Sequence, residues 1–492
     1  MGERPMIDRE AVRNNANYLR QVRPIDPEEI AEYIEGGPHP AVVRETLREE
    51  AFDLRLRERE DGTFVPVPDE PVEPPGWEPE AFPEAYSLAV EDLLVGEFGA
   101  DWHRGESGDR LRAAIRRLKT DYLYGNDVEY DRIAALGYAI YHLPGYYAAI
   151  GYVLDDLVEN RLLDRRLRVL DVGAGVGGPA LGLHDYLPDD AVVDYHAIEP
   201  SANADVLDSL LAATDRNFRT SVYRETVETF LGLEGADSPT TGRSADERLG
   251  GPIDLVLLGN VLSELAEPAR VVAGLRPLLA DDGSLLALAP ADLHTATALR
   301  EVERTVADEG SELTVYSPTL RLWPGRTPAD RGWSFDVAPD LAVPAFQARL
   351  DEAAERGPGD DPGEFTNVDV QFAYSVLRRD GRRRVDVQAA ADRCAPMARS
   401  EEHVTDRVNL FVVKLSHDLS EGRNGVYKIG DGSQQVEHYA VCTRETELNR
   451  YLREADYGSI LFVENGLMLW NDDEEAYNVV VDAETVVDLV AP

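Results

Sequence analysis

Residues 169–178, Val-Leu-Asp-Val-Gly-Ala-Gly-Val-Gly-Gly, decide the fold that we predict for this chain. A short apolar run ends here in a turn with glycines at 173, 175 and 177. Glycines let the chain turn sharply and bring backbone N–H groups close to a ligand. The VGGPALGLHDYL that follows has a helical pattern. The stretch therefore predicts a strand, a tight turn and a helix, the opening unit of a doubly wound α/β domain.

The same pattern repeats downstream, and we place the α/β domain at residues 164–384. Apolar strand segments alternate with helical segments, which implies a parallel, doubly wound sheet. The further strands expected are AVVDYHAIEP (191–200), RTSVYRE (219–225), IDLVLLGN (253–260), SLLALAP (284–290), SELTVYSP (311–318) and VDVQFAYSVLRRDG (368–381).

Two N-terminal segments precede this domain. Residues 1–82 predict three short helices, a hairpin that turns at Asp61-Gly62, and a Pro- and Glu-rich linker. A winged-helix module and a helical extension packed on the next domain both fit that order. Residues 83–163, rich in Tyr, Ala and Leu, predict a helical cap with a break at Pro144-Gly145.

The C-terminal segment, residues 385–492, predicts a different architecture. It begins with an expected helical connector over residues 385–403 and continues as strands interrupted by one helix, ETELNRYLREAD. Strands, one helix and then strands fit a small barrel of the OB type, and a split β-sandwich fits as well.

The amino-acid composition indicates the salt conditions under which the protein works. Its net charge is −44, and lysine occurs only at positions 119, 414 and 428. The acidic residues are spread along the whole chain, which is typical of halophiles, because molar salt shortens the Debye length to about 3 Å and screens self-repulsion. The charge is therefore weak evidence against nucleic-acid binding.

Targeting signals indicate where the protein is located, and the number of cysteines limits which disulfide and metal sites it can contain. No apolar run of about 18 residues is present and the N-terminus is charged, so we expect neither a membrane span nor a secretory signal, and a cytoplasmic location. Cys394 and Cys442 are the only cysteines, which excludes a disulfide framework and a four-cysteine metal site.

The glycine turn also fits G-x-G-x-x-G, so a dinucleotide site competes with an S-adenosylmethionine (SAM) site. Asp171, two residues before the first glycine, can meet the cationic methionine end of SAM directly or through water. It would repel the pyrophosphate of NAD or FAD. Glu199 can accept both ribose hydroxyls of either cofactor. We therefore predict a class I, Rossmann-like SAM-binding domain, with a vestigial empty site as a further alternative.

The candidate cofactor-binding residues all lie at the expected carboxyl edge of the sheet. They are Asp171, Gly173, Ala174, Gly175, Gly177, Glu199, Pro200, Gly259 and Asn260. Three also have structural interpretations, since Asp171 can cap the next turn, Glu199 can be a solvated strand end and Asn260 can form a turn. No metal ligands are expected.

Three stretches together resemble a known family: LDVGAGVGGPALGL, AIEPSANA and GNVLSELAEPARVVAGLRPLLADDGSLLALAP. They are similar to the methyltransferase-like Rsm22 family of the mitochondrial small ribosomal subunit, which has bacterial and archaeal relatives. Good resemblance covers residues 105–390, and the C-terminal domain is loosely similar. The resemblance implies a halophilic archaeal member that binds SAM and acts on the small ribosomal subunit or its rRNA.

The chain departs from that family at one place. Many members carry cysteines after the fifth strand, proposed to hold an Fe–S cluster. Here YSPTLRLWPGRTPADRGWSFDV (316–337) has none. We therefore expect no Fe–S cluster, and we expect this segment to be held by packing of Trp323 and Trp333.

No catalytic group is recognisable. Gly259-Asn260-Val261-Leu262 replaces the Asn/Asp-Pro-Pro-Tyr of exocyclic-amine methylases, and neither cysteine lies near the fourth or fifth strand, where C5 methylation needs one. Without CxxxCxxC, radical SAM chemistry is excluded. An O- or N-methyltransferase driven by proximity fits what remains.

RNA contact is predicted at the densest basic run of the chain, which a charged hairpin tip would explain equally well. Its members are Arg378, Arg379, Arg382, Arg383 and Arg384. We thus expect a cytoplasmic SAM-dependent methyltransferase-like protein that partners the small ribosomal subunit or its rRNA. A non-catalytic SAM-binding assembly scaffold and a small-molecule methyltransferase are the alternatives. The target atom and the oligomeric state stay open.

Overall fold

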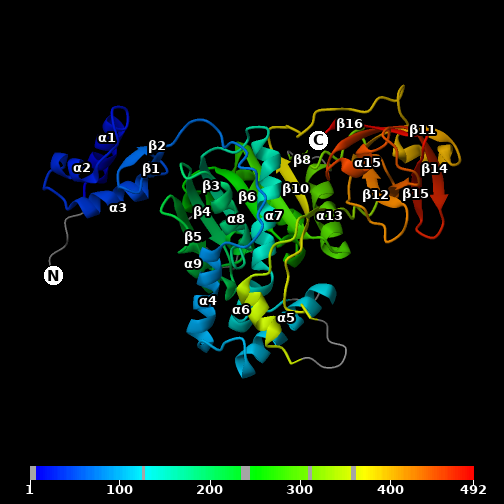
Figure 1. Ribbon diagram of the computed structural model, residues 1–492. Helices are drawn as coiled ribbons and strands as arrows, with labels where there is room; N and C mark the ends of the chain where they lie inside the picture. Colours follow the sequence, from blue (N-terminus) through cyan, green and yellow to red (C-terminus); the bar gives the residue numbers. More distant parts are fainter. Residues whose placement is uncertain (1–6, 125–127, 234–243, 309–312, 356–361) are drawn as a thin grey trace.

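The computed structural model describes residues 7–124, 128–233, 244–308, 313–355 and 362–492. An N-terminal module, a central α/β domain and a C-terminal β-barrel follow one another along the chain, with the barrel at one end of the central sheet and the module at the other (Figure 1). Among the described residues, no helix has the length and apolar character that crossing a membrane requires.

The N-terminal module has a small core of its own. Asp8 and Asp26 cap two of its helices by accepting backbone N–H bonds, as expected of N-cap residues. It meets the central domain through Asn217, whose side chain exchanges hydrogen bonds of 2.8 and 3.0 Å with the backbone of Glu58. Its elements are α1 (Arg9–Leu19), α2 (Pro27–Tyr33), α3 (Pro40–Glu50), β1 (Leu56–Glu58) and β2 (Phe64–Pro66).

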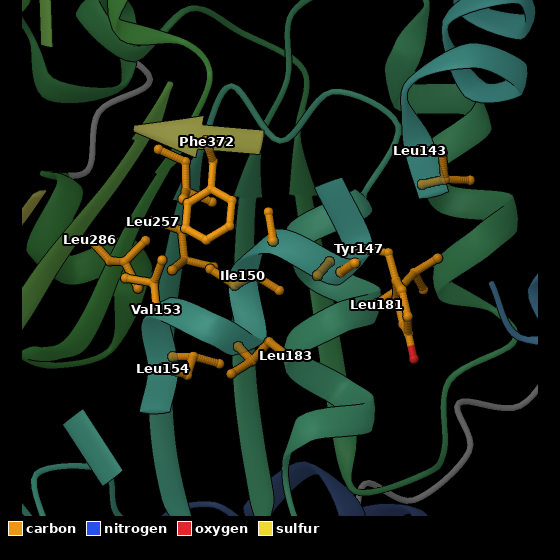
Figure 2. Packing of buried hydrophobic residues seen from close by; sticks show 14 of the residues in the cluster. Leu143, Tyr147, Ile150, Val153, Leu154, Leu181, Leu183, Leu257, Leu286 and Phe372 are labelled. Atoms are coloured by element: carbon orange, nitrogen blue, oxygen red, sulfur yellow. The ribbon is translucent and has the colours of Figure 1, made fainter. Parts of the chain in front are cut away.

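Four helices precede the sheet: α4 (Glu84–Phe98), α5 (Gly105–Tyr124), α6 (Arg132–Tyr141) and α7 (Leu143–Val158). The predicted break at Pro144-Gly145 falls at His142 instead, because proline suits the first turn of a helix, where its missing N–H is not needed. Helix α7 packs directly on the sheet, with Ile150, Val153 and Leu154 against Leu257, Leu286 and Phe372 (Figure 2).

The central sheet has the strand order β5-β4-β3-β6-β7-β10-β8, in which β3 to β7 are parallel and β10 runs antiparallel between β7 and β8. This is the order of class I methyltransferases, so the fold prediction is confirmed. The strands are β3 (Arg166–Val172), β4 (Val192–Ile198), β5 (Phe218–Tyr223), β6 (Ile253–Gly259), β7 (Leu279–Pro290), β8 (Thr314–Ser317), β9 (Asp336–Ala338) and β10 (Val370–Arg378).

Helices cover both faces of this sheet, so side chains that alternate along each strand enter two separate cores. Leu257 faces α7, whereas Val256 and Leu258 enter the other core. The remaining helices of the domain are α8 (Gly178–Tyr186), α9 (Asn203–Leu211), α10 (Val227–Leu231), α11 (Ala245–Leu249), α12 (Pro268–Leu275), α13 (Leu293–Ala307) and α14 (Ala345–Glu352).

The C-terminal domain closes into a barrel, because β11 pairs with both β12 and β14. Its closed order β11-β12-β13-β15-β14, with β13 parallel to β15, is that of an OB-type barrel, as predicted. The elements are β11 (Arg407–Lys414), β12 (Gly425–Gly430), β13 (His438–Cys442), β14 (Ile460–Asn471), β15 (Ala476–Val481) and β16 (Val486–Ala491). The expected helix before β14 shortens to α15 (Tyr451–Glu454).

The predicted helical connector over residues 385–403 is wrong for most of its length. Only Met397–His403 is helical, as the 3-10 helix η3. The preceding backbone hydrogen-bonds instead to β8 and to the segment after it, through Arg384 N–H to Tyr316 O and Ala389 N–H to Leu322 O, both at 2.9 Å. These hydrogen bonds to residues distant in sequence take the place of the bonds that a helix would form within itself.

The segment after β8 also joins the central domain to the barrel. Trp323 Nε1 donates to Asp431 Oδ2 at 2.7 Å, and Leu322 N–H donates to the carbonyl of Asp431 at 3.0 Å. Trp333 Nε1 donates to Ala291 O at 3.0 Å. The indole N–H groups of the two tryptophans therefore help to hold this segment in place.

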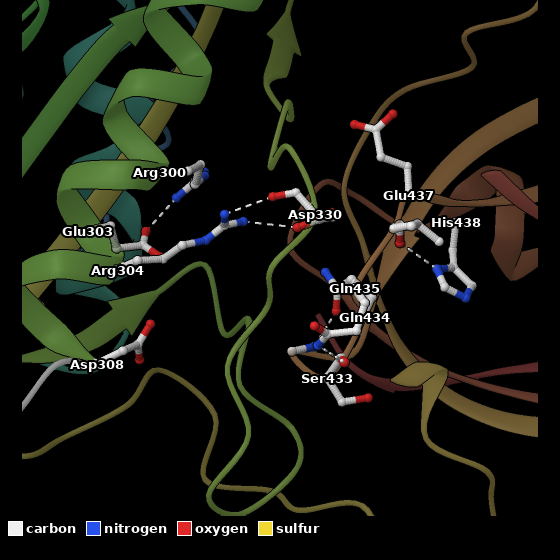
Figure 3. A network of polar contacts seen from close by, with 12 residues as sticks. Arg300, Glu303, Arg304, Asp308, Asp330, Ser433, Gln434, Gln435, Glu437 and His438 are labelled. Carbon is white, nitrogen blue, oxygen red and sulfur yellow. Dashed lines mark hydrogen bonds and ion pairs between the residues drawn. The ribbon is translucent and has the colours of Figure 1, made fainter. Parts of the chain in front are cut away.

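Buried ion pairs line the junction (Figure 3). Glu303 on α13 accepts from both Arg300 and Arg321 at 2.6 Å, and all three side chains are buried. Burial opposes ionisation, but the two guanidinium groups hold the pKa of Glu303 at about 2. Arg304 pairs with Asp330 at 2.9 Å in the same layer.

Glu303→Gln tests this layer. The wild-type pKa lies below the ordinary value of 4.5, so this stabilisation is full above pH 5 and disappears as the pH falls from 4.5 towards 2. We expect the variant to lose about 3 kcal/mol of unfolding free energy at pH 7, because two buried arginines lose their shared carboxylate. Its stability should also vary less between pH 5 and 2. Denaturant titration at several pH values measures both effects. The exposed Glu301→Gln on the same helix is the control, and equal losses in the two variants would contradict the prediction.

Candidate functional site

A cavity of about 600 Å³ opens at the carboxyl ends of β3, β4 and β6. Strand β3 pairs with β4 on one side and with β6 on the other, so the strand order reverses at this point. Open α/β sheets bind ligands in the crevice at such a switch point. The topology therefore places a cavity where the sequence predicted a ligand site.

The glycine turn forms one wall of the cavity. Gly173 and Gly175 both have positive φ angles, 64° and 55°. A Cβ on Gly173 would lie 2.4 Å from Val261, so only glycine allows the loop after β6 to approach. At Gly175 the nearest atom to an added Cβ is 3.8 Å away, so the missing side chain leaves a cradle beside the cavity.

Glu199 ties this turn to the end of β4. Its Oε2 accepts the Gly175 N–H at 2.9 Å, and its Oε1 accepts the backbone N–H and the hydroxyl of Ser201 at 2.9 and 2.6 Å. An ionised carboxylate offers about four acceptor positions, so it can still take a donor from a ligand. Glu199 is buried and lines the cavity, which excludes the interpretation as a solvated strand end.

Asp171 lies beneath the turn and not on the cavity wall. Its side chain is 0% exposed, Oδ2 accepts the hydroxyl of Tyr195, and Oδ1 has no partner among the described residues. Burial raises the pKa of Asp171 to about 7, against the Tyr195 hydrogen bond, with a smaller contribution from Glu199. No helix or turn is capped by this carboxylate in the described hydrogen bonds. The structure thus buries an acceptor without satisfying it, which is costly unless a ligand uses it.

A second cavity, of about 590 Å³, adjoins the first at Asn260, which lines both. Asn260 has a positive φ of 62°, so it forms the turn at the end of β6 and also faces the site. The turn interpretation is therefore confirmed, while the contact of Asn260 with a cofactor stays a prediction. The second cavity is lined largely by aromatic and apolar side chains, among them Tyr122, Tyr141, Tyr146, Leu288 and Phe372.

A hydrogen-bonded cluster separates the two cavities. The hydroxyls of Tyr122 and Tyr130 lie 2.7 Å apart and both donate to Glu264 Oε1, at 2.9 and 3.0 Å. Tyr122 lines the second cavity, while Tyr130 and Glu264 line the first. Desolvation raises the pKa of Glu264, against these two hydrogen bonds. The cluster links the end of α5 and the residue Tyr130 to the loop after β6.

His142 gives the second cavity a neutral polar edge. Its ring stacks on Tyr146 with centroids 5.5 Å apart, and Nε2 has no partner among the described residues. Burial, reinforced by Lys119, lowers the pKa of His142 to about 3, so the imidazole is uncharged at neutral pH.

The structure brings most predicted cofactor residues together. Gly173, Gly175, Glu199, Pro200, Gly259 and Asn260 line the first cavity. Ala174 and Gly177 do not, and Gly177 instead caps α8 with a positive φ of 95°. The sequence interpretation missed Tyr130, Asn203 and Glu264, although Glu264 lies in the quoted GNVLSEL. Asn203 is buried on the wall, and its Oδ1 has no partner among the described residues.

The predicted RNA-contact run is not a surface patch. Arg378 is 1% exposed and binds Ser284 Oγ, Asp282 O and the Asp380 carboxylate. Arg384 pairs with Asp156 and Glu159, both at 2.9 Å. Arg379 and Arg383 donate to backbone carbonyls, which leaves Arg382 exposed. Strand β10 lies inside the sheet, so its end is covered and these arginines serve internal contacts.

The two cysteines lie outside both cavities. Neither Cys394 nor Cys442 is among the lining residues. In the part of the chain that the structure describes, no group of three or more His, Cys, Asp or Glu side chains is placed to hold a metal ion.

Family models match both ends of the chain. One described as the N-terminal domain of a domain of unknown function (DUF8157) matches residues 9–60, and its C-terminal domain matches residues 398–490. These ranges correspond to the N-terminal module and the barrel. No curated protein matches the chain.

Solved methyltransferase structures are remotely similar. The plantazolicin methyltransferase BpumL in complex with SAH is 8% identical, with a TM-score of 0.29, over 60% of this chain and 98% of that one. Precorrin-6y C5,15-methyltransferase from Geobacter metallireducens is 17% identical, with a TM-score of 0.21, over 30% and 66%. A putative SAM-dependent methyltransferase from Streptococcus mutans is 9% identical, with a TM-score of 0.28, over 48% and 50%. At such low sequence identities and TM-scores, only the geometry of the site itself can indicate its chemistry.

Asp171→Asn tests whether the buried carboxylate is kept for a ligand. Its folded pKa of about 7 exceeds the ordinary 3.8, so the stability of the wild type falls as the pH rises from 4 to 7. The near-isosteric amide removes that loss, and we expect the variant to be more stable at pH 8 by about 2–4 kcal/mol. Denaturant unfolding at pH 4 and 8 measures the difference, with the exposed Asp189→Asn as control. A less stable variant at pH 8 would show that Asp171 serves the fold.

Proposed function

We propose that the protein is a SAM-dependent methyltransferase whose cofactor occupies the first cavity. The observation that carries the proposal is Glu199, held at the switch point between the glycine turn and Ser201 with acceptor capacity remaining. The residues present fit SAM. Asp171 Oδ1 and Asn203 Oδ1 are acceptors without partners among the described residues, and Gly175 leaves a cradle on the cavity wall.

Different residues of the chain would contact different parts of the cofactor. Glu199 would hold the ribose hydroxyls, the turn at Gly173–Gly175 would contact the cofactor through its backbone, and Asp171 would attract the cationic amino-acid end from beneath. When bound, SAM supplies a methyl group activated by its sulfonium. Asn260 lines both cavities, so a substrate in the second cavity would lie next to the cofactor. The residues would then act by proximity and exclusion of water.

The second cavity supports a flat, partly apolar substrate. Aromatic side chains surround it, and the uncharged His142 at its edge can accept a hydrogen bond without adding charge. We further propose that this substrate belongs to small-subunit rRNA, on the mature subunit or during its assembly. Three observations support this: the resemblance of the motifs to the Rsm22 family, an aromatic cavity able to stack an exposed base, and an OB-type barrel of the kind that often binds nucleic acid.

Calorimetric titration with SAM and its demethylated product in concentrated KCl tests the cofactor. We expect micromolar binding by the wild type and a loss of about tenfold or more in Glu199→Gln, because an amide cannot accept at every position that the carboxylate does. Glu228→Gln, on the same cavity wall, is the control. No binding by a folded wild type would refute the cofactor proposal.

Transfer of a radiolabelled methyl group to precursor small-subunit particles tests the activity. We expect label in rRNA with the wild type and, at limiting SAM, about tenfold less with Glu199→Gln. Binding of SAM without transfer to any particle or rRNA would favour the assembly scaffold. Label in a small molecule with none in rRNA would favour the small-molecule methyltransferase.

A further inference from the structure

A groove of about 530 Å³ lies where the central domain meets the barrel. Four segments form it: the stretch after β8 with Trp323 and Arg326, the connector at residues 391–396, the 3-10 helix η3, and the start of β11. Each of the four segments contributes an arginine to the lining. The four are Arg326, Arg393, Arg399 and Arg407, and His403 lies beside them.

These arginines differ in how they are neutralised. Arg399 pairs with Glu402, and Arg407 pairs with Asp482 at 2.6 Å. Arg326 and Arg393 are exposed and have no carboxylate within ion-pair distance among the described residues. Asp392 is the only carboxylate among the lining residues. Arg393 lies over the ring of Phe462, 5.5 Å from its centroid, which leaves its charge without a carboxylate. In a chain of net charge −44, the groove therefore holds two guanidinium groups that the fold does not neutralise.

We propose that this groove binds phosphate groups of single-stranded RNA. Guanidinium groups match phosphate geometry because their planar donors form two parallel hydrogen bonds. Salt weakens such contacts, but it also screens the long-range repulsion between RNA and the acidic surface. The proposal rests on the RNA part of the proposed function but not on the cofactor.

One segment of the chain connects the groove with the second cavity. Trp323 and Arg326 lie at the groove, while Trp333, in the same segment, donates to Ala291 O on the wall of the second cavity. An RNA strand held in the groove would thus be fixed to the segment that also borders the proposed substrate cavity.

Binding of a fluorescent twelve-nucleotide oligouridylate to the full chain, at several KCl concentrations, tests the groove. The variant is Arg326→Gln with Arg393→Gln, and the matched control is Arg379→Gln with Arg382→Gln, from the run that sequence alone favoured. We expect the first variant to bind at least about tenfold more weakly and its log–log salt slope to fall by about 1.4, as for two lost phosphate contacts. The control should match the wild type.

Three outcomes would overturn the proposal: equal affinity in both variants, no oligonucleotide binding by the wild type, or inorganic phosphate at millimolar concentration abolishing binding, which would assign the groove to a small anion. Both replaced side chains are exposed, and unfolding curves check that the variant is intact. SAM titration of the same proteins separates the two proposals, since the groove variant should bind SAM as the wild type does.

Discussion

The hydrogen bond from Gly175 N–H to Glu199 Oε2 is the contact on which the site depends. Parallel pairing of β3 with β4 sets Val172 opposite Ile198, and the N–H groups of Gly173 and Ala174 both donate to Ile198 O. The turn after one strand is thereby built onto the end of the next. Glu199 continues that arrangement by holding the turn and Ser201 at once, so the cavity wall is rigid before a ligand arrives. Pre-organisation of this kind lowers the entropy lost on binding.

Near this wall two buried polar side chains lower the stability of the fold because each has an oxygen without a hydrogen-bond partner among the described residues. Asp171 is buried with one oxygen unsatisfied, and Asn203 is buried with its amide oxygen in the same condition. At the domain junction, by contrast, the buried carboxylate of Glu303 is paired with both Arg300 and Arg321. A buried acceptor without a partner costs stability, so the oxygens of Asp171 and Asn203 are the ones that we propose for a ligand, whereas Glu303 stabilises the junction.

Arginine is used in both ways in this acidic chain. Five of the seven residues at 378–384 are arginines, yet Arg378 and Arg384 make internal contacts because β10 lies inside the sheet. The groove at the barrel collects arginines that are far apart in sequence, at 326, 393, 399 and 407. Density along the chain is therefore a poor guide to surface charge, since exposure is decided by the neighbours that the fold supplies.

The sequence by itself determined the α/β order, the glycine turn, the acidic end of β4 and the OB-type pattern of the barrel. Each depends on local periodicity or on residue types that only a few backbone conformations accept. Only the tertiary structure decided the extended connector, the burial of Asp171, the aromatic second cavity and the arginine groove. These arise from contacts between segments distant in sequence, such as Ala389 with Leu322 or Tyr122 with Glu264. No local pattern encodes such contacts, because they exist only when the sheet brings those segments together.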